Sequence, residues 1–327
     1  MSAVSKAESE TPRTPRWIHR WAVLSVCASL PLLLLGAEVT TKKVGMVDPV
    51  GLREPWHLFT ILNRVFYEIG LLIEHSHRLV GYIVGSCVIV LACGLWLQEP
   101  RRWVRWLGVA ALVGVCVQGL LGIFRVNLHV WMGPQLALVH GCFAQLVFAT
   151  LVALTVCTSR RWIEAGRESC AETSPKLQRW TLVVAGGIYL QVVLGAFVRH
   201  TNSPLGQRGH LIVAFGVVAA VVWLLRLVFE NPSAGRALVS SAILLGVLVG
   251  LQILLGVEAW MLKFSGGIAI TDLRPIEPRE EIVRTAHYLL GSGVFATAVA
   301  VAFQAHRKAV WSFRVAPASA SRMEVAV

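Results

Sequence analysis

Long runs of apolar residues alternate with shorter polar connections along almost the whole chain. A helix needs about 20 predominantly apolar residues to cross a bilayer, and each run is close to that length or longer. The pattern therefore predicts an all-α integral membrane protein with eight transmembrane helices. The runs span 21–39, 71–97, 106–124, 134–157, 180–198, 209–229, 238–262 and 284–305.

Polar segments divide this pattern into two halves of four helices, which we expect to form two pseudo-symmetric four-helix bundles. The linker 159–178 separates an N-terminal half, 21–158, from a C-terminal half, 179–306. The tails 1–20 and 307–327 are polar, and we expect both to be disordered. Eight spans place both tails on one side, and Lys and Arg are more frequent in the segments on that side. The positive-inside rule then predicts that both termini are cytoplasmic.

Composition agrees with a membrane protein. The chain of 327 residues is 56% hydrophobic and 15% charged, whereas soluble domains carry about 25% charged residues. Its formal net charge of +12 is spread between apolar runs rather than gathered on one face, so we expect a lipid bilayer and no nucleic acid as partner. The seven cysteines form no CxxC motif and no pair within a connecting loop, so neither a zinc site nor a disulfide framework is indicated.

The odd-numbered predicted helices end in a shared phrase that contains glycine. In three of them the phrase reads Gln-x-x-Leu-Gly, and in the first run the glutamine is missing. Glycine lets a neighbouring helix or a flat ligand approach the backbone closely. The glycines of the phrase are Gly36, Gly122, Gly195 and Gly256.

The even-numbered predicted helices begin with histidine and carry a small residue one turn later. Matching positions lie 133 residues apart for His77 and His210, and 134 apart for Gly122 and Gly256. This regularity indicates two halves related by duplication. Because even helices enter from the outer face, the four histidines are expected at similar depth near the outer leaflet. The pairs are His77/Gly81, His140/Ala144, His210/Ala214 and His287/Gly291.

Two histidines from different helices of one bundle can bind a metal between them. We expect His77 to pair with His140, and His210 with His287, a layout that suits bis-imidazole ligation of haem iron. A lone histidine at a helix mouth is more often an interfacial residue, but four at equivalent positions of a repeat favour ligation. Duplication alone, without a shared role, remains the competing explanation. Arginines near the same ends can pair with haem propionates, and the candidates are Arg78, Arg125, Arg199 and Arg284.

Glu74 lies three residues before His77 and four before Arg78. It either forms a local ion pair with Arg78 or faces the same cavity as His77 and acts on substrate or protons. His200 is a possible polar neighbour of the outer site. Weaker carboxylate candidates are Glu38, Glu68 and Glu258, and the histidines expected to be surface groups are His19, His57, His75, His129 and His306.

These motifs, in this order and over roughly 20–305, resemble the haem A synthases of the CtaA/Cox15 family. The resemblance is carried by Glu74-x-x-His77-Arg78 on the second span and by Gln-x-x-Leu-Gly on odd helices. It also rests on the stretch from Gly195 to Thr201, which reads Gly-Ala-Phe-Val-Arg-His-Thr, and on histidines opening the fourth, sixth and eighth spans.

The resemblance implies a membrane enzyme that oxidises the ring-8 methyl group of haem O to the formyl group of haem A for cytochrome oxidase assembly. The N-terminal half would hold the substrate haem between His77 and His140, and Glu74 matches the family's carboxylate beside it. The C-terminal half would hold haem b between His210 and His287. Implied partners are an electron acceptor, haem O synthase and cytochrome oxidase assembly factors, and the implied location is a bacterial cytoplasmic membrane.

The chain departs from the family pattern at two places. Bacterial members often carry a cysteine pair in an outer loop, and the predicted outer connections 40–70 and 263–283 contain no cysteine. The eighth span reads Thr285-Ala286-His287-Tyr288, without the arginine that follows His77.

Two other classes of protein remain open from the residues. A di-haem electron carrier of the cytochrome b type would use the same four histidines but would not need Glu74. A transporter or assembly factor whose halves gate a cavity would bind no haem. The lack of charged residues in the middle of the spans disfavours the transporter.

Overall fold

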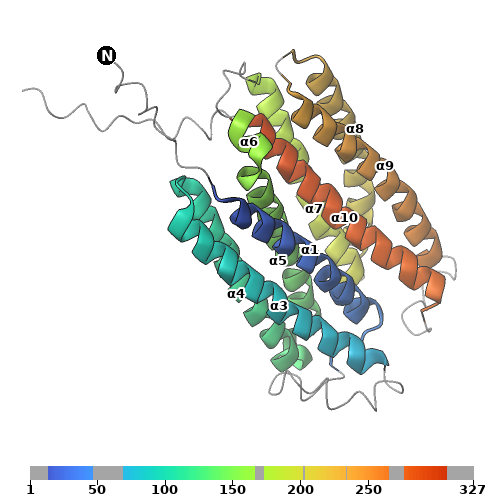
Figure 1. Cartoon of the computed structure of the whole chain (residues 1–327). Helices are drawn as coiled ribbons and strands as arrows, with labels where there is room; N and C mark the ends of the chain where they lie inside the picture. Colours follow the sequence, from blue (N-terminus) through green and yellow to red (C-terminus); the bar gives the residue numbers. More distant parts are fainter. Residues whose placement is uncertain are drawn as a thin grey trace, which may run out of the picture.

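The computed structural model describes residues 14–46, 69–165, 173–201, 203–232, 234–264 and 276–307. Within these ranges the regular structure is entirely α-helical (Figure 1). Eight helices are long and apolar enough to cross a membrane, which confirms the predicted number of spans and a multi-pass membrane protein. The helices are α1 (Arg16–Thr41), α3 (Ile69–Gln98), α4 (Arg102–Asn127), α5 (His129–Thr158), the short α6 (Arg160–Ala165), α7 (Pro175–His200), α8 (Pro204–Phe229), α9 (Arg236–Phe264) and α10 (Pro278–Ala305).

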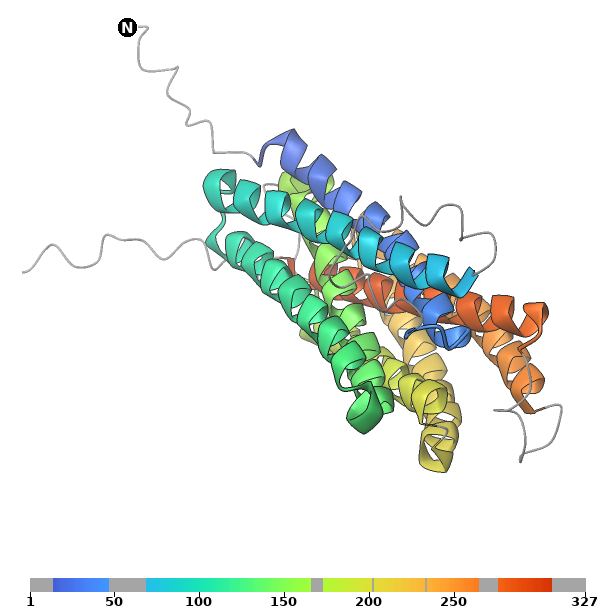
Figure 2. The same ribbon diagram turned by 90° about the horizontal axis from the view of Figure 1, so that it is seen from below.

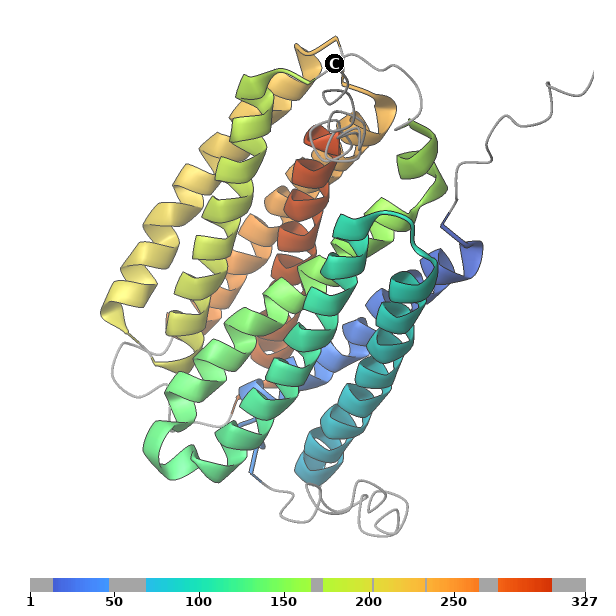
Figure 3. The same cartoon turned by 90° about the vertical axis from the view of Figure 1, so that its left-hand side faces the viewer.

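The helices contact one another in two closed rings. In the N-terminal half α1 packs on α3, α3 on α4, α4 on α5, and α5 on α1. In the C-terminal half α7, α8, α9 and α10 close in the same order. The halves meet through α1 and α5 on one side and α7 and α10 on the other, and Figure 3 shows them side by side. Seen from below in Figure 2, the axes of the long helices are roughly aligned, and consecutive helices such as α3 and α4 run in opposite directions.

Each ring has a core of small and branched apolar side chains. Val88, Leu91 and Leu95 of α3 centre the first core, and Val221, Leu224 and Val301 belong to the second. The opposite faces of the helices are apolar as well: they expose large side chains such as Ile212 and Phe215 at 69% and 72%. An outer surface of this kind is favourable in lipid and unfavourable in water.

Most helices begin well before the apolar runs because polar residues cap or continue them. The backbone N–H groups of Leu177 and Gly206 donate to the hydroxyls of Ser174 and Ser203, both at 3.3 Å, so α7 and α8 start at prolines that follow these serines. The histidines predicted to open helices therefore lie inside them. His210 is 6 residues beyond the first residue of α8, and His140 is 11 beyond that of α5.

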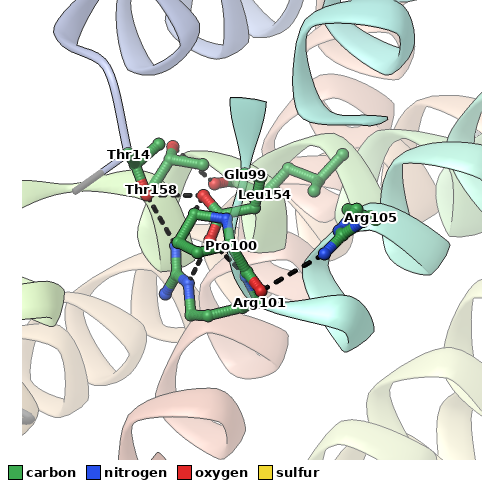
Figure 4. A network of polar contacts seen from close by, with 7 residues as sticks. All are labelled: Thr14, Glu99, Pro100, Arg101, Arg105, Leu154 and Thr158. Carbon is green, nitrogen blue, oxygen red and sulfur yellow. Dashed lines mark hydrogen bonds and ion pairs between the residues drawn. The ribbon is translucent and has the colours of Figure 1, made fainter. Parts of the chain in front are cut away.

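A buried polar cluster lies where α3 ends and α4 begins, next to the residues before α1 and the last turn of α5 (Figure 4). The Arg101 guanidinium donates to the Glu99 carboxylate at 2.6 Å, and both residues are 2% exposed. Thr14, before α1, donates to the same carboxylate at 2.5 Å and accepts from Arg101 at 3.1 Å. The short connection between α3 and α4 thus neutralises its own charges and fixes the start of α1.

The predicted linker 159–178 contains α6 and the first turn of α7, with 166–172 outside the described residues. Residues 1–13 and 308–327 of the predicted tails lie outside them as well, as do Glu68 and His57. The prediction of a disordered tail is wrong for 16–20, because these residues form the start of α1.

Candidate functional site

Each of the four histidines lies against the glycine of the helix that precedes it in the fold. A Cβ atom placed on Gly36, Gly195 or Gly256 would lie 2.9, 3.1 and 3.1 Å from the Cε1 atom of its histidine, and on Gly122 it would lie 3.6 Å away. The glycine repeat and the histidine repeat of the sequence therefore belong to one structural unit, in which an imidazole ring lies against a glycine of the neighbouring helix. We call this arrangement a glycine seat. The pairs are Gly36/His77, Gly122/His140, Gly195/His210 and Gly256/His287.

Three of the histidines are also held through their backbone carbonyl oxygens. The Gln118 side-chain amide in α4 donates to the carbonyl of His140 at 2.9 Å. Gln191 in α7 donates in the same way to His210 at 2.7 Å. In α9, Gln252 donates to the carbonyl of His287 at 3.0 Å. The glutamine of the shared phrase thus links α4, α7 and α9 to the histidine-bearing helix that follows each of them. We call this hydrogen bond an amide tie.

The ring nitrogens of the first histidine of each half have equivalent partners. His77 Nδ1 lies 3.2 Å from the carbonyl oxygen of Leu32, and His210 Nδ1 lies 3.2 Å from that of Gln191. A neutral imidazole that donates from Nδ1 presents the lone pair of Nε2, and this is the usual second contact of a metal-binding histidine. His140 and His287 differ, because among the described residues no partner reaches their buried Nδ1 atoms.

The second pair of histidines has the spacing expected of two axial ligands. The ring centres of His210 and His287 are 6.3 Å apart, with the planes at 79°. Two imidazoles bonded to one metal at about 2 Å on opposite sides have nitrogens about 4 Å apart and ring centres about 6 Å apart. Within the described part of the chain, no three His, Cys, Asp or Glu side chains gather around one point. A metal held by two imidazoles must bring its other ligands, as haem iron does.

The first pair, His77 and His140, lies close enough for the two rings to interact electrostatically. Arg125 is within electrostatic range of both histidines and of Glu74. The predicted members of the N-terminal site are thus brought together. Because half-buried histidines against glycine seats repeat in both halves, the residues present fit a haem in each.

Glu74 is buried, with 3% of its surface exposed, and the Arg78 guanidinium lies 2.5 Å from its carboxylate. The local ion pair anticipated from the sequence is therefore present. Arg125 of α4 is within electrostatic range of this carboxylate as well. The other alternative, that Glu74 faces the cavity of His77 and acts on substrate or protons, stays a prediction.

The four candidate arginines have different surroundings. Arg199 donates to the carbonyl of Ala37 at 2.7 Å and to the Thr41 hydroxyl at 2.8 Å, so it caps the end of α1 across the interface between the halves. Arg284 is paired with Glu280 one turn earlier in α10. Arg125 lies against Gly45, where an added Cβ would be 3.0 Å from its Nη2 atom. Contact with propionates stays a prediction for all four.

His200 lies beside the helix that carries His140. A Cβ on Gly141 would be 3.7 Å from its Nε2 atom, which places this residue of the C-terminal half at the edge of the N-terminal site. Of the weaker candidates, Glu38 accepts from Thr285 at 2.7 Å and Glu258 pairs with Arg279 at 2.5 Å.

Three features were missed from the sequence. His75, expected at the surface, is only 2% exposed, and that expectation is wrong because α3 is buried on both the Glu74 and the His75 side at this level. The glutamines were visible in the shared phrase, yet only the packing of helices shows that they reach the histidine carbonyls. Gln145 of α5, which donates to the Tyr288 hydroxyl at 2.9 Å, belongs to no repeat.

Comparison with known proteins gives matches to one group. The family model COX15-CtaA, described as cytochrome oxidase assembly protein, matches residues 53–205. The chain is 28% identical over 266 residues to a protein named Heme A synthase from Listeria monocytogenes serotype 4a, covering 74% of this chain and 85% of that one. It is 30% identical over 198 residues to Heme A synthase of Lysinibacillus sphaericus, covering 58% and 60%.

Proposed function

Because residues 53–205 match the COX15-CtaA family model and the chain is similar to proteins named Heme A synthase, we propose that it is a membrane haem A synthase of this family. It oxidises the ring-8 methyl group of haem O to a formyl group, which removes four electrons from the methyl carbon and adds one oxygen atom. The observation that carries the proposal is the repeated glycine seat, against which all four imidazoles lie, two in each half.

The two pairs have different roles in this proposal. His77 and His140 hold the substrate haem, beside the buried carboxylate of Glu74. His210 and His287 hold a resident haem b, whose iron, when bound, supplies one-electron transfer. This assignment is supported by the presence of Glu74 in the N-terminal half alone. In α8, the counterpart of α3 in the C-terminal half, Gly206 and Gln207 occupy the positions of Ile73 and Glu74.

Glu74 acts on protons in this mechanism. Breaking the methyl C–H bonds releases protons, and a carboxylate oxygen near the ring can accept them. Arg78 and Arg125 hold the negative charge of Glu74 in place inside a low-dielectric region, where an unpaired carboxylate would be costly. The imidazoles of His77 and His140 orient the substrate, and the packed helices limit the access of water to it.

The proposed setting is a bacterial cytoplasmic membrane with both termini in the cytoplasm. The histidines then lie near the outer leaflet, and the Glu99–Arg101 cluster lies at the cytoplasmic ends. An electron acceptor, haem O synthase and cytochrome oxidase assembly factors are the proposed partners.

Haem analysis of the full-length chain tests this function. We expect protein purified in detergent to show a low-spin haem spectrum, and extraction with mass analysis to yield haem b together with haem O or haem A. His77→Ala should remove haem O and haem A while keeping haem b, and His287→Ala should reduce haem b. Two molecules of haem b per chain, with no other haem, would instead indicate an electron carrier, and absence of haem would refute both.

A further inference from the structure

A hydrogen bond from a glutamine side-chain amide to a histidine carbonyl links α4 to α5, α7 to α8 and α9 to α10. The fourth pair of this kind, α1 and α3, has no counterpart of the glutamine. Gln118, Gln191 and Gln252 each precede the seat glycine by four residues, and each donates to the carbonyl of the seated histidine at 2.7–3.0 Å. The corresponding residue of α1, four before Gly36, is Leu32. A leucine side chain has no donor, so α1 cannot tie the backbone of His77 in this way.

The space for the missing glutamine is nevertheless present. In α10 the small residue one turn beyond the histidine, Gly291, makes room for the glutamine: an added Cβ would lie 3.1 Å from Gln252 Nε2. In α3 the equivalent Gly81 faces the Leu32 side chain, with Cδ1 3.9 Å from an added Cβ. Leu32 thus faces the glycine of α3 as Gln252 faces the glycine of α10.

The asymmetry follows the division into two sites. In the C-terminal half both histidines, His210 and His287, are tied by an amide. In the N-terminal half only His140 is tied, and His77 is connected to α1 through its ring, by the 3.2 Å contact of Nδ1 with the Leu32 carbonyl. A bond to the ring fixes the tautomer, whereas a bond to the backbone resists displacement of the whole helix turn.

We propose that the three glutamines are positioning residues that lock a histidine-bearing helix against its neighbour, and that His77 is the releasable ligand of the pair. This inference rests on the proposed function, because a substrate haem must enter and leave while a resident haem must stay. The site with two amide ties keeps its haem, and the site with one exchanges it by movement of the outer end of α3 away from α1.

Leu32→Gln tests the inference by adding the fourth tie. Haem release is followed as transfer of haem from the detergent-solubilised chain to a soluble apo-globin, with the released haem identified by mass. We expect release of haem O or haem A to slow by about three- to thirty-fold, the effect of one interhelical hydrogen bond in a membrane protein, with release of haem b unchanged. Leu32→Met, similar in volume and without an amide, should release haem as the unmodified chain does.

The reverse change gives an independent measurement. Gln252→Leu should accelerate release of haem b by a similar factor and leave release of haem O or haem A unchanged. Hydrogen exchange of the amides around 70–80 provides a readout without haem, and we expect slower exchange in Leu32→Gln than in Leu32→Met.

Equal release rates and equal exchange in Leu32→Gln and Leu32→Met would overturn the inference while leaving the proposed function intact. If Leu32→Gln does not assemble, an unchanged rate of haem b release in Gln252→Leu overturns it equally. Failure of the unmodified chain to bind haem O or haem A would refute the proposed function instead.

Discussion

The side-chain amide of Gln145 in α5 donates a 2.9 Å hydrogen bond to the hydroxyl of Tyr288 in α10, the residue that follows His287. Gln145 is buried and lies five residues beyond His140 on its own helix. The bond therefore joins the two histidine-bearing helices that meet between the halves. The Arg199 guanidinium lies over the same tyrosine ring, 5.1 Å from its centre. Tyr288 therefore makes a hydrogen bond with Gln145 and a cation–π contact with Arg199.

Tyr288→Phe should weaken the contact between the halves without emptying either site. Loss of one interhelical hydrogen bond lowers the free energy of unfolding by about 0.6–1.7 kcal/mol in membrane proteins. We expect a lower Tm in detergent and unchanged haem content. Gln145→Leu should have a similar effect, and the double variant should be no worse than the more damaging single one. Additive losses would show that the two side chains do not act through their shared bond.

The glycine seats give a prediction with matched controls on the same helices. Gly256→Ala adds a Cβ that would lie 3.1 Å from His287 Cε1, so the imidazole must move from its position opposite His210. Disturbing the surroundings of a metal ligand typically lowers metal affinity about 10- to 100-fold, and we expect a loss of haem b on this scale. Titration of the stripped protein with haem, followed by absorbance, measures it.

Gly250→Ala is the control for that substitution, because no atom outside its own helix backbone lies within 4 Å of the added Cβ. Alanine favours the helix over glycine, so this variant should bind haem normally and be at least as stable. Equal haem binding by the two variants would mean that the seat does not fix the ring.

The eight helices and the proximity of His210 and His287 could be predicted because both follow from local periodicity and from the repeat. Apolar runs of membrane length predict the spans, and the duplication predicts that His77 and His210 lie at the same depth in the membrane. The structure brings His210 and His287 together as predicted. What the sequence could not give is which face of each helix meets which neighbour. That is why the sequence left open whether the glycine makes room for a neighbouring helix or for a flat ligand, and the structure shows the imidazole of the neighbouring helix against it.

Contacts between the halves were the least predictable part of the site. Arg199 was assigned to propionates from its position near the outer end, yet it donates to the end of α1. His75 was expected at the surface because it lies off the face of Glu74 and His77, and it is buried because the packing at this end of α3 covers more than one face. Both outcomes depend on long-range packing of α1, α3 and α7, which no single-segment pattern contains.

Glu74→Gln should separate haem binding from catalysis. Because the amide has the same size as the carboxylate, we expect unchanged haem O binding. The amide cannot take up a proton as a carboxylate does, so catalysis should be impaired. Formation of the formyl product should fall by about 10²–10⁴-fold, the usual contribution of a general base. Mass analysis of haem extracted from membranes over time measures the product.

Glu280→Gln is the matched control for Glu74→Gln. Glu280 is equally buried at 3% exposure and forms the same one-turn ion pair, with Arg284 in α10. If Glu74 serves only as half of an ion pair, the two substitutions should have similar effects on product. A loss confined to Glu74→Gln supports its role at the substrate.

Arg199→Lys distinguishes two roles for the guanidinium. As the structure stands, Arg199 donates to Ala37 and Thr41 at once, and lysine cannot reproduce this planar, two-point contact. A residue that joins the halves should, when replaced, lower the Tm by an amount similar to that of Tyr288→Phe while both haems remain bound. A propionate ligand should instead release haem with little change in the stability of the stripped protein. The two contacts with α1 predict a lower Tm for Arg199→Lys in stripped and loaded protein alike, and release of haem in addition would support the predicted contact with a propionate. Thermal unfolding of stripped and loaded protein, with haem content measured beside it, compares the two roles directly.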